Sequence, residues 1–312
     1  MAETSEWHLR CSTVTTLAPG ADTGRSTAAA YVALTKPRII VQLLITTVPT
    51  MIVAARGLPS LWLIVATMIG GTFAAGGSNA VNMYVDRDID KIMKRTKGRP
   101  IVTGEISPRN ALVFSIGLLV IAGVWLAVFV NPLSSVLALT AAGIYIFIYT
   151  LWLKRTSSQN IVIGGAAGCM PVLVGWAAVT NSLGIEPFVL FAVIFLWTPP
   201  HFWALAVKYK DDYSAANVPM MPSVASMEST SRQIVAYSLA VWATGVAFGP
   251  IADLGWIYLA TSIITGGMFT LYSVQLMRDP NAKRAMKVFT FSLTYLTMLF
   301  VAMAVDQLVL PF

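Results

Sequence analysis

The chain contains the polar sequence Asn82-Met-Tyr-Val-Asp86-Arg-Asp88-Ile-Asp90-Lys-Ile-Met-Lys94-Arg95-Thr-Lys-Gly-Arg99-Pro100 directly after an apolar run, Leu61 to Val81. That run is long enough to cross a bilayer, because a spanning helix takes about 20 residues. One amide and three carboxylates therefore lie where a membrane helix meets water. Ionisable groups at such a position are costly, and they usually have a function.

The spacing of these side chains brings three of them together if the helix continues through the motif. Asn82, Asp86 and Asp90 recur every four residues, and at about 100° per residue they share one face. Asp88 points away from that face. Oxygen ligands in a row suit a hard divalent cation such as Mg2+, which is usually shared with the phosphate oxygens of a substrate. The motif therefore predicts a magnesium site.

Basic residues follow the carboxylates within a few turns, namely Lys91, Lys94, Arg95, Lys97 and Arg99. Carboxylates that hold a metal, followed closely by Lys and Arg, are typical of a polyphosphate site. The alternative is a solvated membrane boundary whose charges only follow the positive-inside bias. The residues favour the polyphosphate site and leave the alternative open.

The composition is that of a polytopic protein embedded in a lipid bilayer. Of the 312 residues, 56% are hydrophobic and 11% are charged, and the mean hydropathy is +0.72. A soluble domain carries about 25% charged residues. The pI near 9.5 and the net charge of +7 do not indicate a nucleic-acid partner, because basic membrane loops account for them. The two cysteines form neither a disulfide framework nor a metal-ligand spacing.

Residues 1–30 differ from the rest of the chain. They are polar and lack the apolar core of a secretory signal. Their three acidic residues are untypical of a mitochondrial transit peptide. We expect a disordered cytoplasmic tail over residues 1–30 and a single membrane domain over residues 31–312.

Nine apolar runs are long enough to span a membrane, so we expect an all-α fold with nine transmembrane helices. They lie near residues 36–55, 60–83, 109–130, 133–153, 160–180, 187–207, 233–252, 255–276 and 288–310. With nine spans, all of the 21 Lys and Arg residues except Arg56 fall on one side of the membrane. The positive-inside rule places that side, with the N-terminus and the motif loop, in the cytoplasm. We expect the bacterial inner membrane.

A second polar motif, His201-Phe-Trp203-Ala-Leu-Ala-Val-Lys208-Tyr-Lys210-Asp211-Asp212-Tyr213, closes the sixth run on the same side. Motifs after the second and sixth spans suggest two four-helix halves with facing sites, plus a ninth helix. Pro199-Pro200 should disturb the helix before His201. That histidine is either a structural hydrogen-bonding group or the lining of a cavity, and its neighbours favour the cavity. Lys36-Pro37-Arg38 and Lys154-Arg155 are either topology signals or diphosphate contacts.

The first motif, Asn82-x3-Asp86-x3-Asp90 followed by Arg95-x3-Arg99-Pro100, resembles the aspartate-rich motif of the UbiA superfamily of intramembrane prenyltransferases. Members have nine transmembrane helices and join an isoprenoid diphosphate to a second acceptor. Further stretches resemble the branch that farnesylates haem: Leu34-Thr-Lys36-Pro37-Arg38, Asn160-Ile-Val-Ile-Gly164-Gly165-Ala-Ala-Gly168, Trp197-Thr-Pro-Pro-His201-Phe-Trp203-Ala-Leu-Ala, and Asp212-Tyr213 with Val218-Pro219-Met220-Met221-Pro222. The resemblance runs from about Leu34 to the C-terminus.

This resemblance implies transfer of farnesyl from farnesyl diphosphate to a vinyl group of haem B, with addition of water. It also implies contact with other membrane proteins of haem synthesis or oxidase assembly. Its Mg2+ ligands would be Asn82, Asp86, Asp90 and Asp212, which form the catalytic set together with Lys208. Its diphosphate contacts would be Arg38, Lys94, Arg95, Arg99, Lys154 and Lys208. Haem would meet His201 and Trp203, and the faces of Tyr145, Tyr149 and Trp203 would shelter the allylic cation.

The second motif departs from the wider superfamily, which carries two aspartates four residues apart. Lys208 stands at the first of these positions and cannot ligate a metal, so we expect it to contact diphosphate directly. Two other functions compete with haem farnesylation. The same fold could prenylate a quinone precursor or a chlorin. A secondary transporter would instead place its carboxylates near mid-span, whereas here they cluster at one membrane face.

Overall fold

The computed structural model describes residues 25–309, and this part of the chain is helical without strands. Nine helical segments within it are long and apolar enough to cross a membrane. The predicted all-α fold and its nine spans are therefore confirmed. Most span boundaries lie within a few residues of those expected from the apolar runs.

The spans are built from the following elements. In chain order they are α1 (Thr27–Thr35) with α2 (Pro37–Ala54), α3 (Leu61–Val85), α5 (Pro108–Phe129), α6 (Pro132–Gly143) with the π-helix η1 (Ile144–Leu153) and α7 (Lys154–Thr156), α8 (Asn160–Gly164) with α9 (Ala166–Thr180), α10 (Ile185–Lys208), α13 (Met227–Ile251), α14 (Trp256–Arg278) and α15 (Ala282–Val309). Three short helices lie between spans: α4 (Arg87–Ile92), α11 (Lys210–Ala215) and α12 (Met221–Val224).

The first helix begins earlier than the sequence predicted. Ser26 caps α1, because its side chain accepts a hydrogen bond from the Ala29 amide at 3.3 Å. Residues 27–30 are therefore helical, although they fall within the segment expected to be a tail. The physical reason is the cap followed by the helix-favouring Thr27-Ala-Ala-Ala sequence. Residues 1–24, where the rest of that prediction falls, lie outside the described residues.

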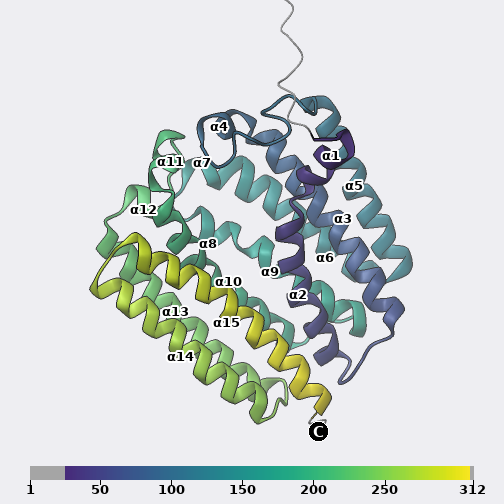
Figure 1. Ribbon diagram of the computed structural model, residues 1–312. Coiled ribbons are helices and arrows are strands. Elements are labelled where there is room, and N and C mark those ends of the chain that lie inside the picture. Colours follow the sequence, from purple (N-terminus) through teal and green to yellow (C-terminus); the bar gives the residue numbers. More distant parts are fainter. Residues whose placement is uncertain (1–24, 310–312) are drawn as a thin grey trace, which may run out of the picture.

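The spans close into a ring in which the first and last lie side by side. α2 packs against both α9 and α15, and α15 also packs against α10 and α14 (Figure 1). α3 packs closely on α5, where a Cβ on Gly77 would lie 2.9 Å from the Ser115 carbonyl oxygen. A glycine is therefore required at this helix contact. On the outside of α5, Val113, Val120 and Val124 are exposed along one face, as expected against lipid.

A buried carboxylate ties α15 to α14 at the end of the bundle away from the polar motifs. Asp306 is almost fully buried, and its two oxygens accept hydrogen bonds from the amides of Gly255 and Tyr258, each at 3.1 Å. These amides belong to the first turn of α14, whose N–H groups have no partner within the helix. The carboxylate thus caps α14 across a helix contact.

We expect Asp306→Ala to lower the free energy of unfolding by about 2 kcal/mol, because it leaves the amides of Gly255 and Tyr258 without their acceptor. The measurement is denaturant unfolding of the full chain in detergent. Asp253→Asn is the matched control, since Asp253 pairs with Arg56 at 3.2 Å while its side chain is 62% exposed, and Asn tolerates its left-handed backbone at φ 53°. Such a pair contributes at most about 1 kcal/mol. Equal losses in the two variants would contradict the capping role.

Candidate active site

The three oxygen-bearing side chains of the first motif meet in a buried site. Asn82, Asp86 and Asp90 are all buried. α3 ends at Val85, yet the Asp86 amide donates to the Asn82 carbonyl and the Asp90 amide to the Asp86 carbonyl, both at 2.9 Å. The four-residue spacing thus continues across the junction between α3 and α4. Asn82 Nδ2 donates to Asp86 Oδ2 at 2.7 Å, so these two side chains adjoin.

Each of these side chains has a cation from a different segment. Lys154 Nζ, from the end of the fourth span, donates to Asp86 Oδ2. Arg99 Nη1, from the loop after α4, donates to Asp90 Oδ2 at 2.5 Å. Lys36 Nζ donates to Asn82 Oδ1 at 2.8 Å. Buried carboxylates need such partners, because removing one partner of a buried pair costs about 3–5 kcal/mol.

Lys36 is a site residue that the sequence analysis placed only within a basic segment. It lies between α1 and α2 in the left-handed region, with φ 55°, and Pro37 begins α2. Asn79 Nδ2 stabilises the break between the two helices, because it donates a hydrogen bond to the Thr35 carbonyl at 2.9 Å. Lys36 therefore reaches Asn82, whereas Arg38, the residue expected to contact diphosphate, is exposed on α2. The Lys-Pro pair was the available indication of this break.

The π-helix η1 supplies a wall of the site. Its hydrogen bonds join residues five apart, as in the Lys154 amide, which donates to the Tyr149 carbonyl. The Thr150 side chain also lies on this segment, and its Oγ1 donates to the Tyr145 carbonyl at 2.8 Å. Thr150 Oγ1 also accepts from Asn82 Nδ2 at 3.1 Å. Tyr145 and Tyr149 stack with ring centroids 5.5 Å apart. π-helices are rare and often occur at functional sites; no pattern in the sequence indicated this one.

The second polar motif lies next to the first, at the same end of the bundle (Figure 1). The Arg95 guanidinium lies 5.7 Å from the centroid of the Tyr209 ring. Ile89 and Met93 pack in one cluster with residues of the second motif and its following loop, namely Ala206, Ala216, Val218 and Met220. Burial raises the pKa of Tyr213, and the nearby Arg95 acts in the opposite direction. The predicted facing of the two motifs is therefore seen in these contacts.

The remaining predicted phosphate and metal residues lie further out. Lys94 and Lys208 are exposed, and Lys208 Nζ lies 5.7 Å from the Tyr209 ring centroid. Asp212 is half-buried on α11. Across residues 25–309, no three His, Cys, Asp or Glu side chains gather as a metal-binding group. Asp212 thus does not join Asp86 and Asp90 in one cluster.

The two residues expected to meet haem lie on α10. His201 is buried, stacks on Trp197 with ring centroids 4.3 Å apart, and its Nδ1 lies 2.7 Å from Ser292 Oγ. Trp203 is completely buried and packs edge-on against Tyr237 at 5.6 Å. Its indole N–H has no hydrogen-bond partner among the described residues. α10 remains helical through Pro199-Pro200, so the expected disturbance before His201 does not interrupt the helix.

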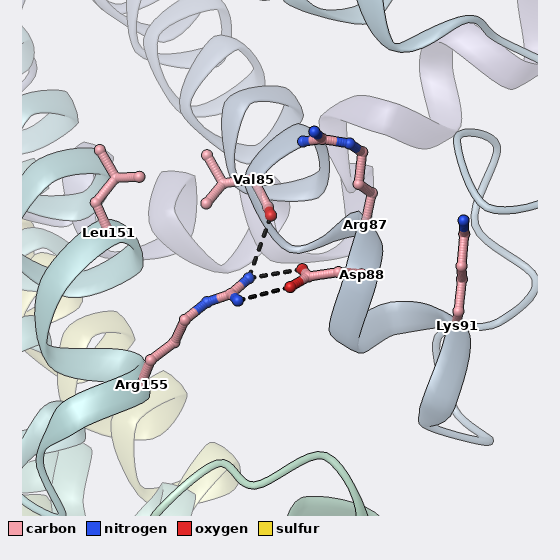
Figure 2. A pocket seen from close by; sticks show the side chains of 6 residues that line it. All are labelled: Val85, Arg87, Asp88, Lys91, Leu151 and Arg155. Atoms are coloured by element: carbon pink, nitrogen blue, oxygen red, sulfur yellow. Dashed lines mark hydrogen bonds and ion pairs between the residues drawn. The ribbon is translucent and has the colours of Figure 1, made fainter.

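Asp88 points away from the three-residue face, as its spacing predicted. Its carboxylate receives two hydrogen bonds from Arg155, which lower the pKa of Asp88 and keep it ionised. Figure 2 shows this pair in a pocket of about 400 Å3. The pocket is lined by Val85, Arg87, Asp88, Lys91, Leu151 and Arg155.

Two features of the buried site suit a hard divalent cation. Asp86 Oδ1 is buried without a hydrogen-bond partner in the described part of the chain, so it can accept a further ligand. The donors around it are two carboxylates and an amide, the oxygen chemistry that Mg2+ prefers. Three cations surround the same donors, which gives the site both the ligands for a metal and the charges for a polyphosphate.

A sequence profile described as the UbiA prenyltransferase family matches residues 43–301. The chain belongs to this family. A protein from Pseudarthrobacter chlorophenolicus named protoheme IX farnesyltransferase is 52% identical over 291 residues, which covers 91% of each chain. One of the same name from Frankia alni is 50% identical, covering 90% of this chain and 98% of its own. The UbiA resemblance drawn from the motifs is thereby confirmed, and the chain is a multi-pass membrane prenyltransferase.

Solved structures of this family share the fold. A structure of digeranylgeranylglyceryl phosphate synthase aligns with a TM-score of 0.75 at 18% identity, covering 91% of this chain and 99% of that one. A UbiA homologue from Archaeoglobus fulgidus, described as bound to GPP and Mg2+, aligns with a TM-score of 0.62 at 17% identity, covering 88% and 99%. At these identities the likeness establishes the UbiA fold.

Within this UbiA-family site, we expect Gly164→Ala to lower prenyl transfer about tenfold. A Cβ at Gly164 would lie 2.2 Å from Tyr149 Cδ2, so the tyrosine ring must leave its place beside Tyr145. The measurement is the initial rate of prenyl transfer by the purified protein. Gly168→Ala is the matched control, because nothing lies within 4 Å of its Cβ position. Comparable rates for the two variants would contradict the role of the Tyr149 position.

Proposed function

We propose that this prenyltransferase transfers the farnesyl group of farnesyl diphosphate to a vinyl group of haem B, with addition of water, to give haem O and diphosphate. The observation that carries the proposal is the shared name of relatives about half identical over nine-tenths of the chain, protoheme IX farnesyltransferase. The buried site of carboxylates, amide and cations supports it, since such a site can accept a diphosphate.

The donor half of the reaction breaks the bond between C1 of the farnesyl chain and the diphosphate oxygen, and the electron pair leaves with diphosphate. Cations aimed at the departing group stabilise this charge, which is usually the largest contribution to such a step. Lys36, Arg99 and Lys154 are the cations proposed for this role, since each contacts a side chain of the buried site. Four further cations of the proposed diphosphate set lie outside the buried site, namely Arg38, Lys94, Arg95 and Lys208. Their positive charge attracts the diphosphate anion toward the site.

Asn82, Asp86 and Asp90 are the proposed Mg2+ ligands, with Asp212 as an outer contributor. When bound, the ion neutralises charge on the diphosphate oxygens. The Archaeoglobus fulgidus homologue is described with GPP and Mg2+, which is compatible with this assignment. Tyr145 and Tyr149 present a stacked pair near the same residues, and aromatic faces attract a cation by about 0.5–2 kcal/mol.

The acceptor half forms a carbon–carbon bond between the farnesyl C1 and the terminal vinyl carbon of haem. The positive charge then sits on the vinyl carbon next to the macrocycle, where water adds and loses a proton. His201 and Trp203 are the proposed haem contacts, and His201 lies among aromatic rings that include Trp197 and Phe289. His201→Ala should impair haem use selectively if this assignment holds.

We place the reaction at the cytoplasmic face of the bacterial inner membrane. The support is the distribution of Lys and Arg, of which only Arg56 falls on the opposite side. Other membrane proteins of haem synthesis or oxidase assembly are proposed partners, as supplier of haem B or recipient of the product.

The deciding experiment is mass spectrometry of haem extracted after incubation of the purified protein with haem B, farnesyl diphosphate and Mg2+. A haem heavier by one farnesyl group plus water, formed only without chelator, is the expected product. Parallel incubations replace haem B by a phenolic quinone precursor. If the phenol is prenylated and the haem unchanged, the donor site stands and the haem assignment is wrong.

A further inference from the structure

An ion pair on the outer side of the first motif has no part in the proposed chemistry. Arg155 donates two hydrogen bonds to the Asp88 carboxylate, both at 2.7 Å, and one to the Val85 carbonyl at 3.3 Å (Figure 2). Such a fork fixes the orientation of the guanidinium as well as its position. The pair joins α4 to α7, and so connects the loop of the first motif to the end of the fourth span.

The same guanidinium faces the buried site. Arg155 Nη2 lies 3.8 Å from Asp86 Oδ1, which is too far for a hydrogen bond. This oxygen is buried and lacks a hydrogen-bond partner within residues 25–309, while Asp86 Oδ2 is engaged by Asn82 and Lys154. Arg155 therefore holds a positive charge beside the one acceptor that Asp86 has left, without occupying it.

A second pair elsewhere in the chain provides a comparison. Asp279 and Arg284 form an ion pair of 2.9 Å, with side chains 60% and 38% exposed, against 58% and 35% for Asp88 and Arg155. Pairs this exposed contribute little to stability. The two pairs match in charge and exposure. They differ in that Arg155 holds Asp88 through two hydrogen bonds and Arg284 holds Asp279 through one, and in that Arg155 adjoins the buried carboxylate.

We propose that Asp88 is a positioning residue for the diphosphate site. By holding both nitrogens of Arg155, it keeps a cation beside the place where the diphosphate binds. It also prevents the guanidinium from closing the remaining gap to Asp86 Oδ1, the oxygen that a metal ion would need. This inference rests on the proposed function, because it assigns Asp88 and Arg155 to the same reaction.

The test compares Asp88→Asn, Arg155→Gln and the double variant in lipid nanodiscs, with Asp279→Asn as the matched control. Asp88→Asn should raise both the KM for farnesyl diphosphate and the Mg2+ concentration for half-maximal rate about tenfold, the effect of one charge-assisted hydrogen bond. Its kcat at saturation should change less than about twofold. In the double variant the Mg2+ requirement should return toward that of the wild type, because no guanidinium competes for Asp86, while the KM stays high.

A purely structural pair gives a different result. In that case Asp88→Asn and Asp279→Asn would shift the melting temperature and the kinetic constants equally, which would overturn the proposal. A double variant that needs still more Mg2+ than Asp88→Asn would overturn it as well. If the wild type forms no farnesylated haem, the proposed function fails, and the same variants are compared by calorimetric binding of inorganic pyrophosphate with Mg2+. Equal pyrophosphate affinities in Asp88→Asn and Asp279→Asn would then refute the positioning role independently.

Discussion

Asp86→Asn is expected to lower the rate of farnesyl transfer by a factor of about 1,000 or more. The substitution keeps the shape of the side chain but removes the charge that faces Lys154 and is proposed to bind Mg2+. It also replaces one carboxylate oxygen by an NH2 group, which cannot bind a metal. Both the metal and the departing diphosphate therefore lose stabilisation. The measurement is the single-turnover rate at several Mg2+ concentrations.

This variant leaves the half-buried Lys154 ammonium group with a weaker partner, which lowers the stability of the fold. The double variant Asp86→Asn with Lys154→Met separates the two effects. It removes both charges, and should recover the folding stability while remaining inactive. Asp279→Asn, at an exposed pair, should retain the wild-type rate. An Asp86→Asn rate within tenfold of wild type, with unchanged Mg2+ dependence, would eliminate Asp86 from the metal site.

Lys154→Met is expected to lower the transfer rate about 100-fold, because it removes a half-buried cation beside the proposed diphosphate position. The affinity of the protein for a metal ion, measured without substrate, should not fall with the rate. The ammonium group and a divalent cation both bind the Asp86 carboxylate and repel each other, so the affinity for Mn2+ in the absence of substrate should not fall in this variant. Electron paramagnetic resonance of Mn2+ measures this affinity.

The control for this variant is Lys97→Met, which removes an exposed lysine from the loop after α4. It should change the rate less than twofold and leave Mn2+ binding as it was. Loss of Mn2+ binding in Lys154→Met would show that the lysine supports the metal site instead of competing with it. A rate close to that of Lys97→Met would remove Lys154 from the diphosphate set.

The features that could be predicted are those set by periodicity. Nine apolar runs specify nine spans because each must satisfy its own backbone in lipid. A four-residue spacing places Asn82 and Asp86 in contact, and turns Asp88 outward, wherever the helix is nearly continuous. These properties depend on local geometry, which the sequence contains directly.

Contacts between segments that are distant in the sequence could not be predicted from periodicity. Arg38 and Lys36 are equally basic and two residues apart, yet only Lys36 reaches Asn82, because α3 stabilises a left-handed residue before Pro37. The Ser292 partner of His201 comes from the ninth span, far along the chain. The haem assignment of His201 and Trp203, and the diphosphate assignments of Lys94 and Lys208, stay predictions.

The π-helix also constrains how the gene can vary in length. Each residue of an α-helix turns the chain by about 100° and advances it by about 1.5 Å. Losing a single codon within Ile144–Leu153 would let this segment tighten into an α-helix, and everything after it would rotate by about that angle. Lys154 would then face away from Asp86, so the lesion would abolish the site even where the lost residue is not one of its own. Among homologues, the length of this segment should therefore be invariant even where its apolar side chains are exchanged freely.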